Sequence, residues 1–214
     1  MYTSKFFSII LLFTTTFCSA QSLDFTPVGS FTEGVEGPAT DMEGNIYAVN
    51  FEEQGTIGKV TPDGKASLFV KLSDGSIGNG IRFGDKNEMF IADYTNHNVL
   101  RVDMRNKHIE VYAHEAKANQ PNDLAISPSK ILYASDPNWS DNTGNIWKVT
   151  KENGFELLEA NMGTTNGIEV SMDGKKLYVN ESVQRIVNDI MGRYIDKEAK
   201  EANELDLSIK PFYD

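Results

Sequence analysis

Four oxygen-bearing side chains recur at one spacing along the chain and could together bind a hard metal ion. They open four similar segments and are Glu36, Asn79, Asn122 and Asn166. Successive members lie 43, 43 and 44 residues apart. Carboxylate and amide oxygens suit Ca²⁺, or Mg²⁺ and Mn²⁺. Because only Glu36 is charged, tight binding needs a further carboxylate, and Asp123 and Asp136 are candidates within the third unit.

A turn is the competing interpretation of each asparagine. Asn-Gly and Asn-Asp pairs are common in turns, so any one of these residues taken alone favours a turn over a ligand. The occurrence of all four in register, with Glu36 in the equivalent place, favours a shared site. Asn79 is the weakest member, because only its register supports it.

The elements that must position these residues are short strands in a repeated unit. Each segment is followed by a turn and a second apolar run, whose aromatic residue repeats as Tyr47, Phe90, Tyr133 and Tyr178. A period of 40 to 50 residues with several strands per unit is typical of propeller blades. Since a propeller gathers equivalent positions of its blades around one axis, the sequence predicts an all-β propeller with the four residues at its central channel.

The predicted units follow one another without a linker. Three run over residues 36–71, 79–113 and 122–160, and a fourth begins at Asn166. An additional strand is expected at Leu23–Phe31. Ile195–Leu207 has a helix-like composition, although outer strands of the fourth unit are expected there.

Charge and the N-terminal segment limit the classes of partner and compartment. The 214-residue chain has a net charge of −11, which argues against a nucleic-acid partner because such proteins need a basic surface. Residues 1–20 have the pattern of a secretory signal peptide, with an apolar stretch too short to span a membrane and cleavage expected before Gln21. We therefore expect a mature domain over residues 21–214, with no membrane span, that is secreted or periplasmic. A lipoprotein anchored through Cys18, the only cysteine, is the alternative.

Other residues with reactive side chains give weaker signals. The three histidines, His97, His108 and His114, lack the close spacing of a metal-binding pair and are expected at the surface. No Gly-Xaa-Ser-Xaa-Gly motif is present, so nothing supports a serine hydrolase. Trp139 is interpreted as a packing or rim residue, with the floor of a sugar-binding site as the alternative.

Three motifs of this chain resemble those of the SMP-30/gluconolactonase (regucalcin-like) family. They are Glu36-Gly-Pro, Pro121-Asn-Asp-Leu and Asn166-Gly-Ile-Glu-Val-Ser, and the resemblance extends over about residues 34–180. It implies a six-bladed propeller whose central divalent metal supports hydrolysis of a sugar lactone or related small ester. The implied ion is Ca²⁺ first, with Zn²⁺, Mg²⁺ and Mn²⁺ as alternatives. By position, Glu36, Asn122 and Asn166 are metal ligands, and Asn122 and Asp136 are substrate contacts.

The chain departs from the family pattern at two places. Gln120 stands where some members carry a substrate-binding arginine, so their substrate preference does not transfer. The catalytic aspartate that the family implies is expected just beyond Asp214, which leaves the catalytic residue unknown. The expectation is therefore a propeller with about four of six four-stranded blades, incomplete at its C-terminus.

Two further functions are compatible with the sequence. A secreted, non-catalytic propeller could bind a sugar or a protein partner through loops such as Asp93–Asn98. An inactive fragment is the second alternative, and its open propeller edge would favour self-association.

Overall fold

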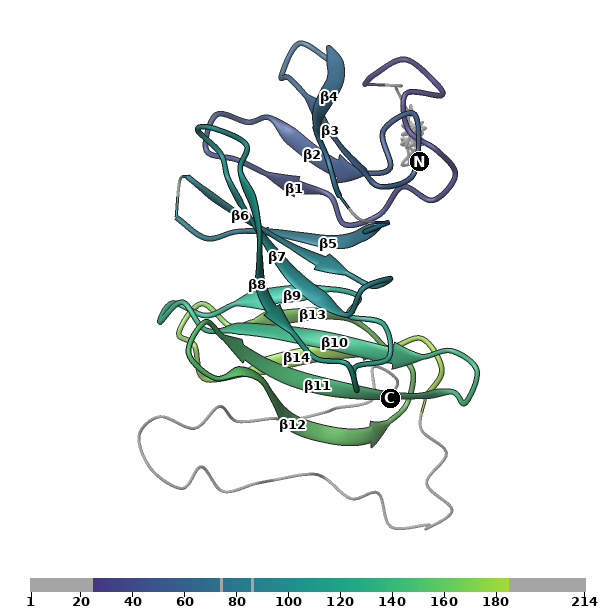
Figure 1. Cartoon of the computed structure of the whole chain (residues 1–214), viewed down its shortest axis with the longest axis vertical. Helices are drawn as coiled ribbons and strands as arrows, with labels where there is room; N and C mark the ends of the chain where they lie inside the picture. Colours follow the sequence, from purple (N-terminus) through teal and green to yellow (C-terminus); the bar gives the residue numbers. More distant parts are fainter. Residues whose placement is uncertain (1–24, 74, 86, 185–214) are drawn as a thin grey trace, which may run out of the picture.

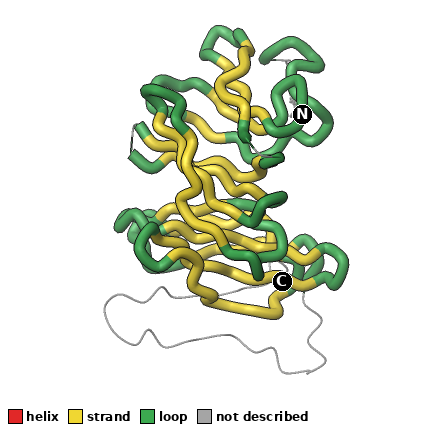
Figure 2. The backbone as a smooth tube through the Cα atoms, in the orientation of Figure 1, coloured by secondary structure: helices red, strands yellow, loops and turns green. Residues whose placement is uncertain are grey.

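The repeated unit forms a series of twisted antiparallel sheets. The structure is a computed structural model that describes residues 25–73, 75–85 and 87–184. Within these ranges every regular element is a β-strand (Figure 2). The first three sheets follow one another along the long axis of the molecule, and β13 and β14 overlap the third sheet in this view (Figure 1).

Three blades are complete and a fourth contains two strands among the described residues. Blade one consists of β1 (Ala39–Thr40), β2 (Ile46–Val49), β3 (Thr56–Val60) and β4 (Ala66–Lys71). Blade two consists of β5 (Gly78–Phe83), β6 (Glu88–Asp93), β7 (Asn98–Asp103) and β8 (Ile109–His114). Blade three consists of β9 (Leu124–Ile126), β10 (Leu132–Asn138), β11 (Thr143–Thr150) and β12 (Gly154–Met162). Blade four contains β13 (Thr165–Val170) and β14 (Leu177–Glu181).

Each complete blade is a simple meander in which consecutive strands are hydrogen-bonded neighbours. In blade one, for example, Tyr47 pairs with Ala39 of β1 and with Lys59 of β3. A hairpin turn at residues 62–64 joins β3 to β4, and Gly64 there adopts a φ of 83°. Glycine suits this turn because a positive φ is costly for residues with a Cβ.

The hydrophobic core lies between the blades, in three layers. The repeated aromatic residue is buried in each: Tyr47 between blades one and two, Phe90 between blades two and three, and Tyr133 between blades three and four. Tyr47 makes edge-to-face contacts with Phe69 of its own blade and Phe83 of the next. The blades are therefore held together by the same residue position that marks the repeat in the sequence.

The predicted strands of blades one to three and the inner strands of blade four are confirmed. The expected outer strands of blade four, the helix-like segment Ile195–Leu207 and the predicted signal peptide lie outside the described residues. The strand predicted at Leu23–Phe31 is wrong over its described part. A turn forms there instead, in which the Ser30 amide donates to the Pro27 carbonyl (3.1 Å), and only Phe31 pairs, as an isolated bridge to Phe51.

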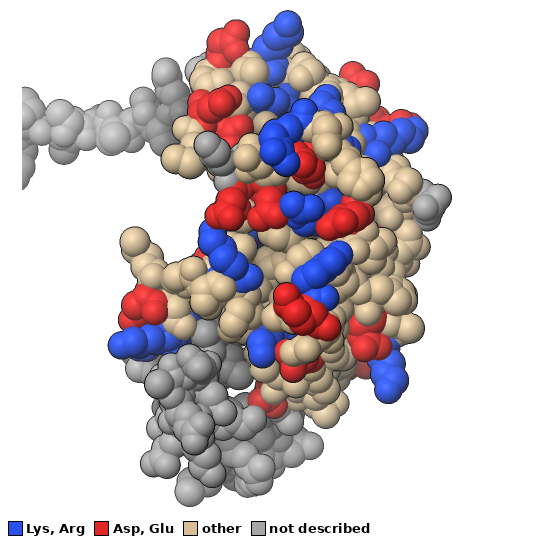
Figure 3. Space-filling model, turned by 60° about the vertical axis from the view of Figure 1, so that its left-hand side comes forward, with Lys and Arg blue, Asp and Glu red and all other residues tan. Residues whose placement is uncertain are grey.

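The surface carries charges of both signs. On the face shown in Figure 3, Lys and Arg side chains are interspersed with Asp and Glu, and neither sign forms a separate patch. Among the described residues, no helix is long and apolar enough to cross a membrane.

Candidate functional site

The four matched residues lie at the start of the innermost strands. Glu36 and Asn122 precede β1 and β9 by two or three residues, whereas Asn79 and Asn166 are the second residues of β5 and β13. These four strands are the first strands of their blades, so the matched residues share one end of the sheet stack. Their common register in the sequence is thus also a common place in the fold.

Glycine allows the matched segments of neighbouring blades to touch. A Cβ on Gly37 would collide with the carbonyl of Asn79. A Cβ on Gly80 would lie 2.6 Å from the Asp123 Oδ1 atom, and the Gly80 amide donates to the Asn122 carbonyl at 2.7 Å. The backbones at Glu36, Asn79 and Asn122 therefore follow one another from blade to blade around the inner side of the sheets.

Three of the matched side chains, those of Glu36, Asn79 and Asn122, make no polar contact with the part of the chain that the structure describes. Glu36 is exposed and forms neither a hydrogen bond nor an ion pair there. Asn122 is only 8% exposed, and its side-chain amide is without a hydrogen bond to another described residue. Asn166 donates through Nδ2 to Ser182 Oγ (2.9 Å), which leaves its Oδ1 atom available. The Glu36 carboxylate and the Asn122 amide therefore have hydrogen-bonding capacity that no described residue uses.

This donor set fits a hard divalent ion in type but is short of charge. It offers the carboxylate of Glu36 and the amide oxygens of Asn122 and Asn166, all oxygen ligands. Across residues 25–184, apart from the two residues not described, no group of three or more His, Cys, Asp or Glu side chains could hold a metal. The fit therefore rests on one carboxylate with amides, as the sequence predicted.

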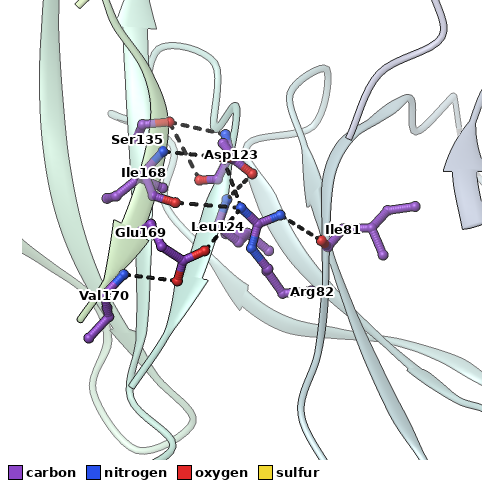
Figure 4. Close-up of polar contacts among 8 residues, drawn as sticks. All are labelled: Ile81, Arg82, Asp123, Leu124, Ser135, Ile168, Glu169 and Val170. Atoms are coloured by element: carbon purple, nitrogen blue, oxygen red, sulfur yellow. Dashed lines mark hydrogen bonds and ion pairs between the residues drawn. The ribbon is translucent and has the colours of Figure 1, made fainter. Parts of the chain in front are cut away.

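Asp123, the first candidate for an additional carboxylate, is occupied by protein contacts (Figure 4). Its Oδ1 atom accepts from the Leu124 amide (2.8 Å). Its Oδ2 atom accepts from Arg82 Nη2 (3.1 Å) and from the Ile168 amide (3.2 Å). Burial raises the pKa of Asp123 above its ordinary value, although the Arg82 charge and the two amides act in the opposite direction. Asp123 thus joins blades two, three and four.

Asp136, the second candidate and a predicted substrate contact, is fully buried. Its carboxylate accepts hydrogen bonds from four uncharged N–H donors, which belong to Gln120, Asn119, Asn145 and Trp147. A carboxylate with no exposed surface and four donors has little capacity left for a substrate. The prediction that Asp136 contacts substrate therefore has no support from its surroundings, because the protein itself uses both oxygens.

Among the described residues, no hydrogen bond or ion pair joins the residues with weaker sequence signals to the matched side chains. His108 and His114 are exposed, as predicted, and His97 is partly buried. His114 Nδ1 lies 2.9 Å from the Oδ1 atom of Asn98. Trp139 is 46% exposed in the loop between β10 and β11.

Arg82 is a functional candidate that the sequence analysis missed. Its guanidinium donates to the Ile81 and Ile168 carbonyls (2.9 and 3.5 Å) and lies 3.9 Å from Glu169 Oε2 (Figure 4). The sequence contained one signal for Arg82, which is a charged residue at a position of the inner strand where two other blades have a small apolar residue. Blades one and three carry alanine at the position of Arg82, Ala39 and Ala125.

The sequence is similar to a known protein family and to a curated relative. The family model described as "SMP-30/Gluconolactonase/LRE-like region" matches residues 34–206. A curated gluconolactonase of Zymomonas mobilis is 28% identical over 182 residues, which cover 72% of this chain and 51% of the relative. The chain thus spans about half the length of the curated relative that it matches.

Solved structures show the same fold at low sequence identity. A chain of the nidogen/laminin complex matches with a TM-score of 0.62 at 18% identity, over 74% of this chain and 60% of the other. A gluconolactonase from Xanthomonas campestris has a TM-score of 0.59 at 16% identity, with coverage of 70% and 55%. These likenesses support the propeller architecture.

Proposed function

This chain belongs to the SMP-30/gluconolactonase/LRE-like family, and from that premise we propose that it hydrolyses a sugar lactone or related small ester at a divalent-metal site. Glu36, Asn122 and Asn166 would hold the metal. The observation that carries the proposal is the contact between matched segments of neighbouring blades, combined with the uncommitted side chains of Glu36 and Asn122.

The donor types narrow the choice of ion. One carboxylate and two amides are hard oxygen ligands, which favour Ca²⁺, Mg²⁺ or Mn²⁺ over Zn²⁺. Among these, Ca²⁺ tolerates carbonyl-type oxygens and irregular geometry best, so we propose Ca²⁺. The chemistry that such an ion would supply when bound is polarisation of the ester carbonyl and orientation of the attacking water.

The chain's own residues supply binding and orientation. Glu36 provides the negative charge of the site, and the mostly buried Asn122 amide can either accept through its oxygen or donate to a substrate hydroxyl through its N–H groups. The oxygens of Asp123 and Asp136 already accept several protein hydrogen bonds, so neither is assigned as the proton acceptor.

A lactonase assay tests this function. We expect this chain, or a longer protein that contains it, to hydrolyse simple aldonolactones such as glucono-1,5-lactone, measured by acid release in a pH-stat. Chelator and Glu36→Gln should each reduce turnover at least about tenfold, because the charge that holds the metal is lost. Glu33→Gln, which changes an exposed carboxylate three residues away, is the matched control and should retain activity.

The result that contradicts the proposal is turnover unaffected by both chelator and Glu36→Gln. Saturable, metal-independent binding of a sugar without hydrolysis across a lactone panel would also contradict it, and would favour a binding propeller.

A further inference from the structure

A second set of polar residues repeats along the chain and lies inside the blades. Each of the four residues lies near the end of the second strand of its blade: Asn50, Asp93, Asp136 and Glu181. Asp93 and Glu181 are the last residues of their strands, Asn50 directly follows its strand, and Asp136 lies inside its strand. Each bonds to the backbone of the segment that leads into the inner strand of its blade. The partners are the Gly34 carbonyl (2.6 Å) and the amides of Ile77 (3.3 Å), Gln120 (2.6 Å) and Gly163 (2.7 Å). We call these four residues the anchor residues.

The anchor residues act close to the matched residues of the candidate site. Their backbone partners lie two or three residues before Glu36, Asn79, Asn122 and Asn166. A side chain that fixes the backbone at this distance restricts where the following residue can lie. The anchor residues thus determine the entry of each inner strand.

Asp136 has the largest set of contacts that bear on the site. Its Oδ1 atom accepts from the Gln120 amide, and its Oδ2 atom accepts from Asn119 Nδ2 (3.3 Å), Asn145 Nδ2 (3.2 Å) and Trp147 Nε1 (2.8 Å). All four donors are uncharged. An aspartate stabilised only by such donors holds them in fixed directions, because each has to point at one of two oxygens.

The same residue also reaches the next blade. The Asp136 amide donates to Thr165 Oγ1 (3.2 Å), and Thr165 directly precedes Asn166. The backbone carbonyl of the adjacent Ser135 accepts from the backbone amide of Asn122 (2.8 Å), and the Ser135 backbone amide donates to the Asp123 carbonyl (3.0 Å). Ser135 and Asp136 therefore connect two of the three proposed metal ligands, Asn122 and Asn166, through one strand.

Asp93 provides a natural comparison within the same protein. It is as fully buried as Asp136 and accepts from Ser76 Oγ (2.7 Å), Thr95 Oγ1 (3.0 Å) and Asn98 Nδ2 (2.9 Å) as well as from the Ile77 amide. The inner strand that it anchors carries Asn79, which is outside the proposed ligand set. Loss of either carboxylate disturbs a similar hydrogen-bond network, but of the two only the Asp136 carboxylate anchors an inner strand that carries a proposed ligand, Asn122.

We propose that the Asp136 carboxylate is a positioning group that holds Asn122 in place for the metal through the Gln120 amide, a role that rests on the proposed function. It contacts neither metal nor substrate. Partners behind the direct ligands commonly change metal affinity about 10- to 100-fold when they are removed. The energetic reason is preorganisation: without the anchor, binding the metal must also order Asn122.

The test compares Asp136→Asn with Asp93→Asn by calorimetric titration with Ca²⁺ alone. The temperature is one at which circular dichroism shows that both variants are folded. Asp136→Asn should weaken Ca²⁺ affinity at least about tenfold, whereas Asp93→Asn should stay within about threefold of the unaltered protein. Both should lower the unfolding temperature. Equal affinities of the two variants would overturn the proposal, since a purely structural role predicts the same effect for both.

Trp147→Phe decides the matter if Asp136→Asn does not fold. It removes one donor to Asp136 and keeps an aromatic ring in the core, and exposed Trp139→Phe is its control. A loss of Ca²⁺ affinity in Trp147→Phe alone supports the positioning role, and unchanged affinity overturns it. Failure of the unaltered protein to bind Ca²⁺ would instead overturn the proposed metal site, so the two failures are distinguishable.

Discussion

At the scale of single residues, the Arg82 guanidinium joins the inner strands of three blades. It pairs with Asp123 of blade three and donates to the Ile168 carbonyl of blade four. The side chains of Arg82 and Asp123 are 23% and 19% exposed. Because the folded-state pKa of Asp123 lies above its ordinary value, its ionisation costs stability as the pH rises through that pKa, and Arg82 offsets part of the cost.

We therefore expect Arg82→Gln to lower the free energy of unfolding by about 2 kcal/mol at pH 7, since it leaves a mostly buried carboxylate without its cation. The pKa of Asp123 should rise further in this variant. Lowering the pH through that pKa protonates the carboxyl group and removes the unpaired charge, so the deficit should shrink towards pH 4. Urea unfolding of both proteins across this pH range measures the effect.

Arg105→Gln is the control for this prediction, because Arg105 pairs with Asp103 at 2.8 Å on the surface and is 70% exposed. Exposed ion pairs contribute less than about 1 kcal/mol. A deficit in Arg82→Gln that does not change with pH, or that is no larger than in Arg105→Gln, would contradict the role given to Arg82.

At the scale of elements, the strands could be predicted where the cause is local. The apolar runs of the repeat predicted units over residues 36–71, 79–113 and 122–160, and the strands of blades one to three exceed these bounds by no more than two residues. The strand predicted at Leu23–Phe31 was wrong because the turn over Pro27–Ser30 overrides the apolar pattern. The surroundings of Asp136 could not be predicted from the sequence. An aspartate at this position can face either an open channel or buried N–H groups, and its residue type does not distinguish the two.

Close contact between inner strands gives a prediction at this scale. Gly80→Ala would place a Cβ 2.7 Å from the Cα of Asp123 and 2.9 Å from the Asn122 carbonyl oxygen, both rigid backbone atoms. Such overpacking should cost about 2 kcal/mol, measured by chemical unfolding. Gly167→Ala is the matched control at the equivalent Asn-Gly pair, where the nearest atom is the Asn180 Cβ at 3.9 Å, and should change stability by less than about 0.5 kcal/mol. Equal losses would contradict the inferred contact.

At the scale of the whole molecule, the repeat predicted both the propeller and the common place of the matched residues. Those predictions succeed because a constant period of about 43 residues forces equivalent positions into equivalent places. Contacts that cross between blades were not predictable in this way. Arg82 meets Ile168, 86 residues further along the chain. Both residues stand in repeated segments, but the repeat does not show that the side chain of one reaches the backbone of the other.

The anchor residues lie between these cases. Successive anchor residues lie 43, 43 and 45 residues apart, nearly as regular as the matched residues, so the repeat contained the signal for them. Whether such a residue supports the backbone or binds a ligand is decided by its burial and its hydrogen-bond partners. Both are set by the folded sheets, so the sequence alone did not show them.

The central claim is that residues of separate blades form one divalent-metal site, and calorimetric titration of Ca²⁺ into the protein and its Glu36→Gln variant tests it most directly. We predict one saturable site per chain, weakened at least about tenfold in Glu36→Gln and unchanged in Glu33→Gln, because only Glu36 stands in register with Asn122 and Asn166. Absence of saturable binding, or the same affinity in all three proteins, would contradict the claim.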